Sequence, residues 1–110
     1  MKPGTILNTS WGYDMTINNF CEVLENTGKT VKCIMLKKIN LSETASTYSK
    51  EREGKPFRLR LKTYPSLPGR IFANGSYPFL VKSNGEEQKR SDSFEAANPE
   101  QTSFYENHMD

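Results

Sequence analysis

Few residues of this 110-residue chain belong to the types that most often carry out catalysis or bind metals. There are two cysteines, Cys21 and Cys33, and one histidine, His108, which lies close to the C-terminus. A structural zinc site takes four ligands, more than these side chains supply. A base so near a chain end is also poorly held in a catalytic geometry. We therefore expect no metal, no cofactor and a frayed surface histidine.

The sequence motifs of common enzymes are also missing. The chain has no glycine-rich phosphate loop ahead of a helix, no nucleophile in an elbow and no carboxylate cluster at metal-binding spacing. Asp14 lies two residues before Thr16, a spacing at which a carboxylate bonds the backbone of a turn. The alternative is that Asp14 acts as an acid, base or ligand beside Tyr13. The sequence predicts a non-enzymatic protein, with a hydrolase or nuclease as the weaker hypothesis.

The most distinctive interaction feature is a row of cations. Apolar and basic residues alternate over residues 57–62, which predicts a half-buried strand with Arg58, Arg60 and Lys62 on its outer face. Such a row could follow a phosphate backbone. It is also typical of the solvated face of any antiparallel strand, where cations discourage aggregation. The candidate contact residues are Arg58, Arg60, Lys62, Lys37, Lys38, Arg70 and Tyr64, with Phe72 as a second stacking side chain.

Length and composition limit the class of protein. The chain fits a single domain, residues 1–110, because a second core would be too small to be stable without metals or disulfides. Apolar residues make up 35% of it and charged residues 25%, and the net charge is +2. This charge is too balanced to indicate a polycationic nucleic-acid protein or an acidic DNA mimic. No apolar leader or membrane-spanning run is visible, so we expect a cytoplasmic protein.

A Trp-Gly-Tyr-Asp segment marks a corner between the apolar runs 5–7 and 20–24. Tryptophan and tyrosine combine a large buried area with a polar tip, so their placement beside a glycine specifies a particular corner. We expect this segment to be structural. The box comprises Trp11, Gly12, Tyr13, Asp14, Thr16 and Phe20.

The clearest hairpin follows this box. Residues 20–25 and 30–36 are β-prone and are joined by Asn-Thr-Gly, which suits a three-residue loop with Gly28 left-handed. That loop would place Val23 opposite Val31 and Cys21 opposite Cys33. In a cytosolic protein we expect the two facing cysteines to be reduced and half-buried, as small hydrophobic residues of the core.

Residues 41–55 are polar and hydroxyl-rich and show no hydrophobic period. We expect a mobile loop, which in a small domain is either a contact surface or a plain solvated excursion. Further along, Asn74-Gly75 separates two β-prone runs and predicts a two-residue hairpin. Pro78 lacks an amide donor, so the strand at residues 77–82 should border solvent on one side.

The C-terminal third is less regular. Residues 83–86 repeat the hairpin signal, but residues 87–92 are too polar to predict a strand. Residues 93–97 could form one helical turn, and residues 93–110 as a whole should be a weakly anchored tail. Short strands separated by glycine and proline predict a mainly β fold, a small twisted antiparallel sheet or partly closed β-barrel.

Residues 4–31 resemble a group of small, functionally uncharacterised proteins of bacteriophages and other mobile elements. The resemblance covers about a quarter of the chain and rests on Gly-Thr-Ile-Leu, the Trp-Gly-Tyr-Asp-x-Thr box, Phe20 and Val23, and Gly-Lys-Thr-Val at 28–31. Met15 and Ile17 replace polar residues usual in the box, and Cys21 replaces a common aromatic. The resemblance implies a shared fold and a setting in which small proteins often bind host or nucleic-acid targets.

These observations lead to two hypotheses. The first is an accessory protein that binds a host protein or ribonucleoprotein complex, for example as an anti-CRISPR or other anti-defence factor that acts by occlusion. The second is a small β-barrel protein that binds nucleic acid through the basic strand. We expect no membrane association, and the sequence leaves homo-oligomerisation open.

Overall fold

The computed structural model describes residues 1–12, 16–80 and 87–107. Over these ranges it contains seven strands and no helix. The strands are β1 (Ile6–Trp11), β2 (Ile17–Asn26), β3 (Thr30–Ser42), β4 (Ala45–Lys62), β5 (Phe72–Leu80), β6 (Glu87–Ala96) and β7 (Phe104–Tyr105). The prediction of a mainly β fold is confirmed.

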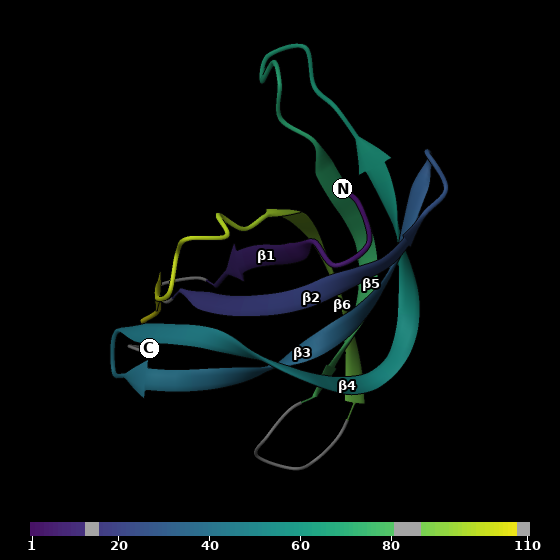
Figure 1. Cartoon of the computed structure of the whole chain (residues 1–110). Helices are drawn as coiled ribbons and strands as arrows, with labels where there is room; N and C mark the ends of the chain where they lie inside the picture. Colours follow the sequence, from purple (N-terminus) through teal and green to yellow (C-terminus); the bar gives the residue numbers. More distant parts are fainter. Residues whose placement is uncertain (13–15, 81–86, 108–110) are drawn as a thin grey trace.

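Six of the strands form a closed antiparallel barrel (Figure 1). The order around the barrel is β3-β2-β1-β6-β5-β4, and the pairing of β3 with β4 closes it. The seam between β1 and β6 is short, with Leu7 opposite Ala96 and Asn8 opposite Glu95. The seventh strand, β7, lies outside the barrel and pairs with the start of β4. The predicted barrel is therefore present and is closed.

Alternating side chains fill the barrel. In β4, Leu59 is buried while Arg58 and Arg60 on either side are exposed, as the alternation over residues 57–62 predicted. The buried residues of the inner cluster are Leu7, Cys21, Val23, Val31, Cys33, Met35, Leu59, Ala73, Tyr77 and Phe94. Both cysteines are reduced and are fully buried rather than half-buried.

A second apolar cluster joins the C-terminal segment to the rest of the fold. Phe104 packs edge-on against Phe20, with ring centroids 4.9 Å apart, and Leu36 completes the buried group. The prediction of a weakly anchored tail at residues 93–110 is therefore wrong for its described part, because Phe104 and Glu106 are 6% and 1% exposed.

The first hairpin forms, but the predicted register is wrong. Val23 lies opposite Cys33, and Cys21 lies opposite Met35. A bulge between Val23 and Glu25 adds one residue to β2, and residues 27–29 rather than 26–28 connect the strands, with the amide of Thr27 bonded to the carbonyl of Thr30 at 2.9 Å. Gly28 has φ +95°, so its left-handed conformation is confirmed.

Residues 41–55 are not a mobile loop. They form the tip of β3, a tight turn and the first half of β4, with Ile39 opposite Thr47 and Ser42 opposite Ala45. Three register shifts interrupt the β3–β4 ladder. These irregularities explain why no period of two is visible in the sequence. We call residues 36–52, together with β7, the arm.

Asn74 and Gly75 do not form a hairpin turn but lie inside β5, where they pair with Ser93 and Asp92 of β6. A Cβ atom on Gly75 would lie 3.3 Å from a methyl group of Leu59, so the glycine allows the close approach of β4.

The polar residues 87–92 do form a strand, contrary to the prediction, because Glu87 to Phe94 of β6 pair with β5. Strand β6 continues through residue 96, where its last two residues pair with β1. The prediction of a helical turn at 93–97 is therefore wrong. The ladder between β4 and β5 covers only Phe72 to Asn74 of β5, so Pro78 pairs on one side only, with β6. The hairpin predicted at 83–86 lies outside the described residues.

Candidate interaction surfaces

Arg58, Arg60 and Lys62, which we call the basic strip, lie exposed on the outer face of the barrel. Strand pairing determines their neighbours. Arg58 lies opposite Lys32 of β3, Arg60 lies between Thr30 of β3 and Asn74 of β5, and Lys62 lies opposite Phe72 of β5. No carboxylate is directly opposite any of the three cations.

The other predicted cations are in a different situation, because each is neutralised by a carboxylate. Lys37 pairs with Glu51 at 3.0 Å, and this hydrogen bond raises the Lys37 pKa. Arg70 forms a bidentate ion pair with Glu95, and the hydrogen bonds of this pair raise the Arg70 pKa. Lys37, Lys38 and Arg70 therefore carry little free positive charge.

Only one of the two aromatic residues predicted to stack bases is accessible. Phe72 is buried, at 9% exposure, so the prediction that it offers a stacking surface is wrong. Tyr64 is half-buried; its ring lies edge-on to Phe72, and its hydroxyl accepts a hydrogen bond from Asn74 at 3.2 Å. The ammonium group of Lys62 lies 5.2 Å from the centre of the Tyr64 ring. Tyr64 is thus held at the end of the basic strip.

The described residues of the Trp-Gly-Tyr-Asp box have structural contacts. The guanidinium carbon of Arg90 lies 3.5 Å from the centre of the Trp11 ring, and the Asn19 amide lies 2.6 Å from the indole nitrogen. Phe20 is buried in the second apolar cluster, and Thr16 pairs with Asn107. Gly12 has φ +132°. Tyr13 and Asp14 lie outside the described residues, as does His108.

A buried polar group lies next to Trp11. The hydroxyl of Tyr77 donates a 2.5 Å hydrogen bond to Asp92, which also pairs with Arg90 at 3.0 Å. Burial and the contact with Asp92 raise the Tyr77 pKa well above its usual value. These interactions stabilise one end of the barrel and leave Tyr77 protonated and unsuited to act as a base near neutral pH.

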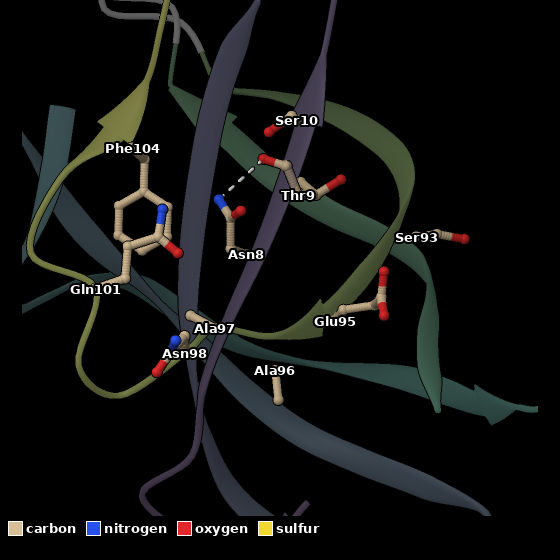
Figure 2. Close-up of a pocket in the computed structure, with 10 residues that line it drawn as sticks. All are labelled: Asn8, Thr9, Ser10, Ser93, Glu95, Ala96, Ala97, Asn98, Gln101 and Phe104. Carbon is tan, nitrogen blue, oxygen red and sulfur yellow. Dashed lines mark hydrogen bonds between the residues drawn. The ribbon is translucent and has the colours of Figure 1, made fainter. Parts of the chain in front are cut away.

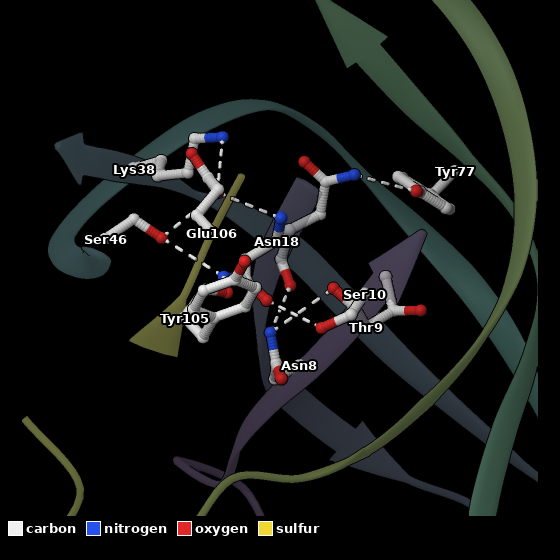
Figure 3. Close-up of polar contacts among 10 residues, drawn as sticks. Asn8, Thr9, Ser10, Asn18, Lys38, Ser46, Tyr77, Tyr105 and Glu106 are labelled. Carbon is white, nitrogen blue, oxygen red and sulfur yellow. Dashed lines mark hydrogen bonds and ion pairs between the residues drawn. The ribbon is translucent and has the colours of Figure 1, made fainter. Parts of the chain in front are cut away.

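A second network fastens the arm to the barrel (Figure 3). One carboxylate oxygen of Glu106 accepts hydrogen bonds from the backbone N–H of Asn18 at 3.0 Å, the ammonium group of Lys38 at 3.0 Å and the hydroxyl of Ser46 at 3.1 Å. The side-chain amide of Asn18 also donates to the carbonyl of Tyr105 at 2.7 Å. No local sequence pattern predicted this network, because its members lie up to 88 residues apart.

Polar residues line an open groove of about 410 Å³ beside the short β1–β6 seam (Figure 2). Its residues are Asn8, Thr9, Ser10, Ser93, Glu95, Ala96, Ala97, Asn98, Gln101 and Phe104. Several of their polar atoms already have partners in the fold: Ser10 bonds Asn18, Ser93 bonds Asn74, and Glu95 bonds Arg70. The groove therefore offers few unused polar groups to a ligand.

The arm carries exposed apolar side chains. Ile39, Leu41 and Tyr105 are 43%, 53% and 61% exposed. Ile39 pairs with Thr47, Tyr105 pairs with Ala45, and these partners are two residues apart in β4, so both rows share one face. Leu41 is two residues from Ile39 in β3, at the register shift between Asn40 and Ser42. We call Ile39, Leu41 and Tyr105 the apolar patch.

Among the described residues, no group of three or more histidine, cysteine or carboxylate side chains could hold a metal ion. Burial raises the pKa of the Cys21 thiol, so this thiol is a poor nucleophile. Over the same ranges, no helix is long and apolar enough to cross a membrane.

The fold and these surfaces define a small closed antiparallel β-barrel with a projecting arm. No protein-family model matches the chain, and comparisons with curated proteins and with solved structures gave no match. The resemblance of residues 4–31 to phage and mobile-element proteins stays a prediction.

Proposed function

We propose that this chain is a non-enzymatic accessory protein of a bacteriophage or mobile element that binds a host protein or ribonucleoprotein complex in the bacterial cytoplasm. The observation that supports this most is the apolar patch on the arm. Its three large side chains are 43% to 61% exposed and belong to neither apolar cluster. Large apolar and aromatic side chains of this kind form the centres of protein interfaces.

The construction of the arm favours binding. Its strands are held by the β3–β4 ladder, by β7 and by the buried Glu106 network. A surface that is already ordered loses little conformational entropy when it binds, so more of the contact energy appears as affinity. The segment expected to be a mobile loop is ordered by strand pairing, and we propose it as the contact surface.

An anti-defence role agrees with these features. Occlusion of a host nuclease or its nucleic-acid site needs only a rigid shape with a binding surface and no catalytic group. The implied origin on a phage or mobile element provides the selective setting for such a role.

The test compares two sets of exposed apolar residues. Ile39, Leu41 and Tyr105 are replaced together by serine, and the control replaces Leu67 and Ile71, which are 36% and 45% exposed outside the arm. Each tagged protein is incubated with bacterial host lysate, and captured proteins are quantified and then purified to confirm direct binding. We expect the arm variant to lose a partner that the control retains. Equal capture by both variants would contradict the proposal.

A further inference from the structure

The basic strip stands out among the arginines of this chain. Arg52, Arg70 and Arg90 each form an ion pair with a carboxylate, to Glu22, Glu95 and Asp92 respectively. Arg58 and Arg60 form no ion pair with any residue that the structure describes, and neither does Lys62. Of the five arginines, only Arg58 and Arg60 therefore lack an ion pair with a described residue.

The neighbours of the strip increase its unbalanced charge. Residues opposite one another in a sheet usually pair charges of opposite sign, and like charges there are destabilising. Arg58 has Lys32 opposite it, whereas Arg60 has only the neutral Thr30 and Asn74. The nearest acid in this row is Glu25, which lies beyond Lys32. An anionic ligand bound at the strip would offset this unbalanced positive charge.

We propose that the basic strip binds single-stranded nucleic acid through its phosphates, at a site separate from the apolar patch. Alternate residues of a strand are roughly 6.8 Å apart, so the three cations span about 14 Å. This spacing is comparable with that of successive phosphates in an extended strand. The guanidinium groups of Arg58 and Arg60 each offer a planar pair of donors that suits phosphate oxygens.

The surroundings of the strip favour a single strand over a duplex. Tyr64 is held beside Lys62 with part of its ring exposed, and a stacked base would have to be unpaired. Thr30 and Asn74 flank Arg60 with neutral side chains, which bond Thr27, Tyr64 and Ser93 within the fold. A duplex keeps its bases paired and offers Tyr64 no free base on which to stack.

The affinity of the strip for a single strand should fall as the salt concentration rises. For a single strand, the logarithm of the affinity falls with the logarithm of salt at a slope of about −0.7 per phosphate neutralised. Three contacts give a slope of about −2. Raising salt from about 50 to 200 mM should then weaken binding about 20-fold.

The experiment measures fluorescence anisotropy of a labelled 20-nucleotide thymidine oligomer and of a duplex of equal length. The test variant is Arg58→Ser, Arg60→Ser and Lys62→Ser together. The control is Lys2→Ser, Lys50→Ser and Lys89→Ser, exposed lysines outside the strip. Both variants change the net charge from +2 to −1, since each removes three positive charges. We expect the strip variant to lose binding and the control to retain it within about threefold.

Three results would overturn the proposal: no binding of the oligomer at 50 mM salt, equal loss in both variants, or duplex binding at least as tight as single-strand binding. Circular dichroism checks that each variant folds. If the triple strip variant does not fold, the single variant Arg60→Ser decides, because its salt slope should fall by about 0.7. Capture of a protein partner through the apolar patch is a separate readout, so the two proposals can fail independently.

Discussion

Replacing Glu106 by alanine should destabilise the whole fold. The change leaves three donors without their acceptor: the Asn18 amide, the Ser46 hydroxyl and the Lys38 ammonium group. Breaking a buried ion pair by removing one partner costs about 3–5 kcal/mol. The side chain of Lys38 is 17% exposed and can turn toward water, so we expect a loss near the lower limit, about 3 kcal/mol.

That loss is large for a domain whose free energy of unfolding is on the order of 5–15 kcal/mol. It should lower the melting temperature by about 12 °C in a domain of this size. Urea unfolding followed by tryptophan fluorescence measures the free energy, because Trp11 is the only tryptophan. The control is Glu100→Ala, an exposed acid in the same segment, which should change stability by less than about 0.5 kcal/mol.

Glu106→Gln keeps an acceptor oxygen but removes the charge, so its loss should fall between those of the other two variants. If Glu106→Ala costs no more than Glu100→Ala, the network does not hold the arm to the barrel. The reasoning about its rigidity would then be refuted.

Two more predictions concern buried groups inside the barrel. The raised pKa of Tyr77 means that above pH 10 its unfolded form ionises while its folded form does not, so stability linked to Tyr77 is constant below pH 10 and falls above it. Tyr77→Phe should lack this part of the alkaline loss, and an unchanged pH profile of unfolding in that variant would contradict the assignment. Cys21 and Cys33 are fully buried, so an alkylating reagent at pH 8 should modify them only at the rate of unfolding, whereas rapid labelling of the native protein would show an open barrel.

The parts of the fold that could be predicted are those governed by neighbouring residues. The alternation around Leu59 identified the strand and its exposed cations, and Gly28 identified the first turn. The register of that hairpin could not be predicted, because the bulge after Val23 depends on how β2 packs against its neighbours and leaves no mark in the local sequence.

The arm and its buried contacts were missed for a related reason. Residues 41–55 have too few apolar residues to form a core with local partners, and they are ordered by contacts from the C-terminal segment. Tyr48 packs against Phe104, and Ser46 bonds Glu106, across separations of more than 50 residues. Sequence periodicity indicates that one face of an element is buried, but it does not indicate which distant segment covers that face.

Strand β4 links the two candidate surfaces, because it carries the basic strip and pairs with both strands that carry the apolar patch. The first half of β4 belongs to the arm and the second half to the barrel wall, and the strand bends at Gly54, where φ is +70°. Between Glu53 and Phe57, β4 has three residues where β3 has only Ile34, so the bend is built into the ladder. A single ordered strand therefore fixes the distance between the apolar patch and the basic strip.

A fixed distance would matter if the partner were a ribonucleoprotein. A protein surface held by the patch and a nucleic-acid strand held by the strip would be bound by one rigid body, and the second contact would form at a high effective concentration. The strip residues lie at the end of β4, whereas the patch residues lie on β3 and β7 beside its start, so their losses of binding free energy should add. Additive losses on one purified complex would place both surfaces in the same interface, whereas a loss confined to one set would leave the other surface outside it.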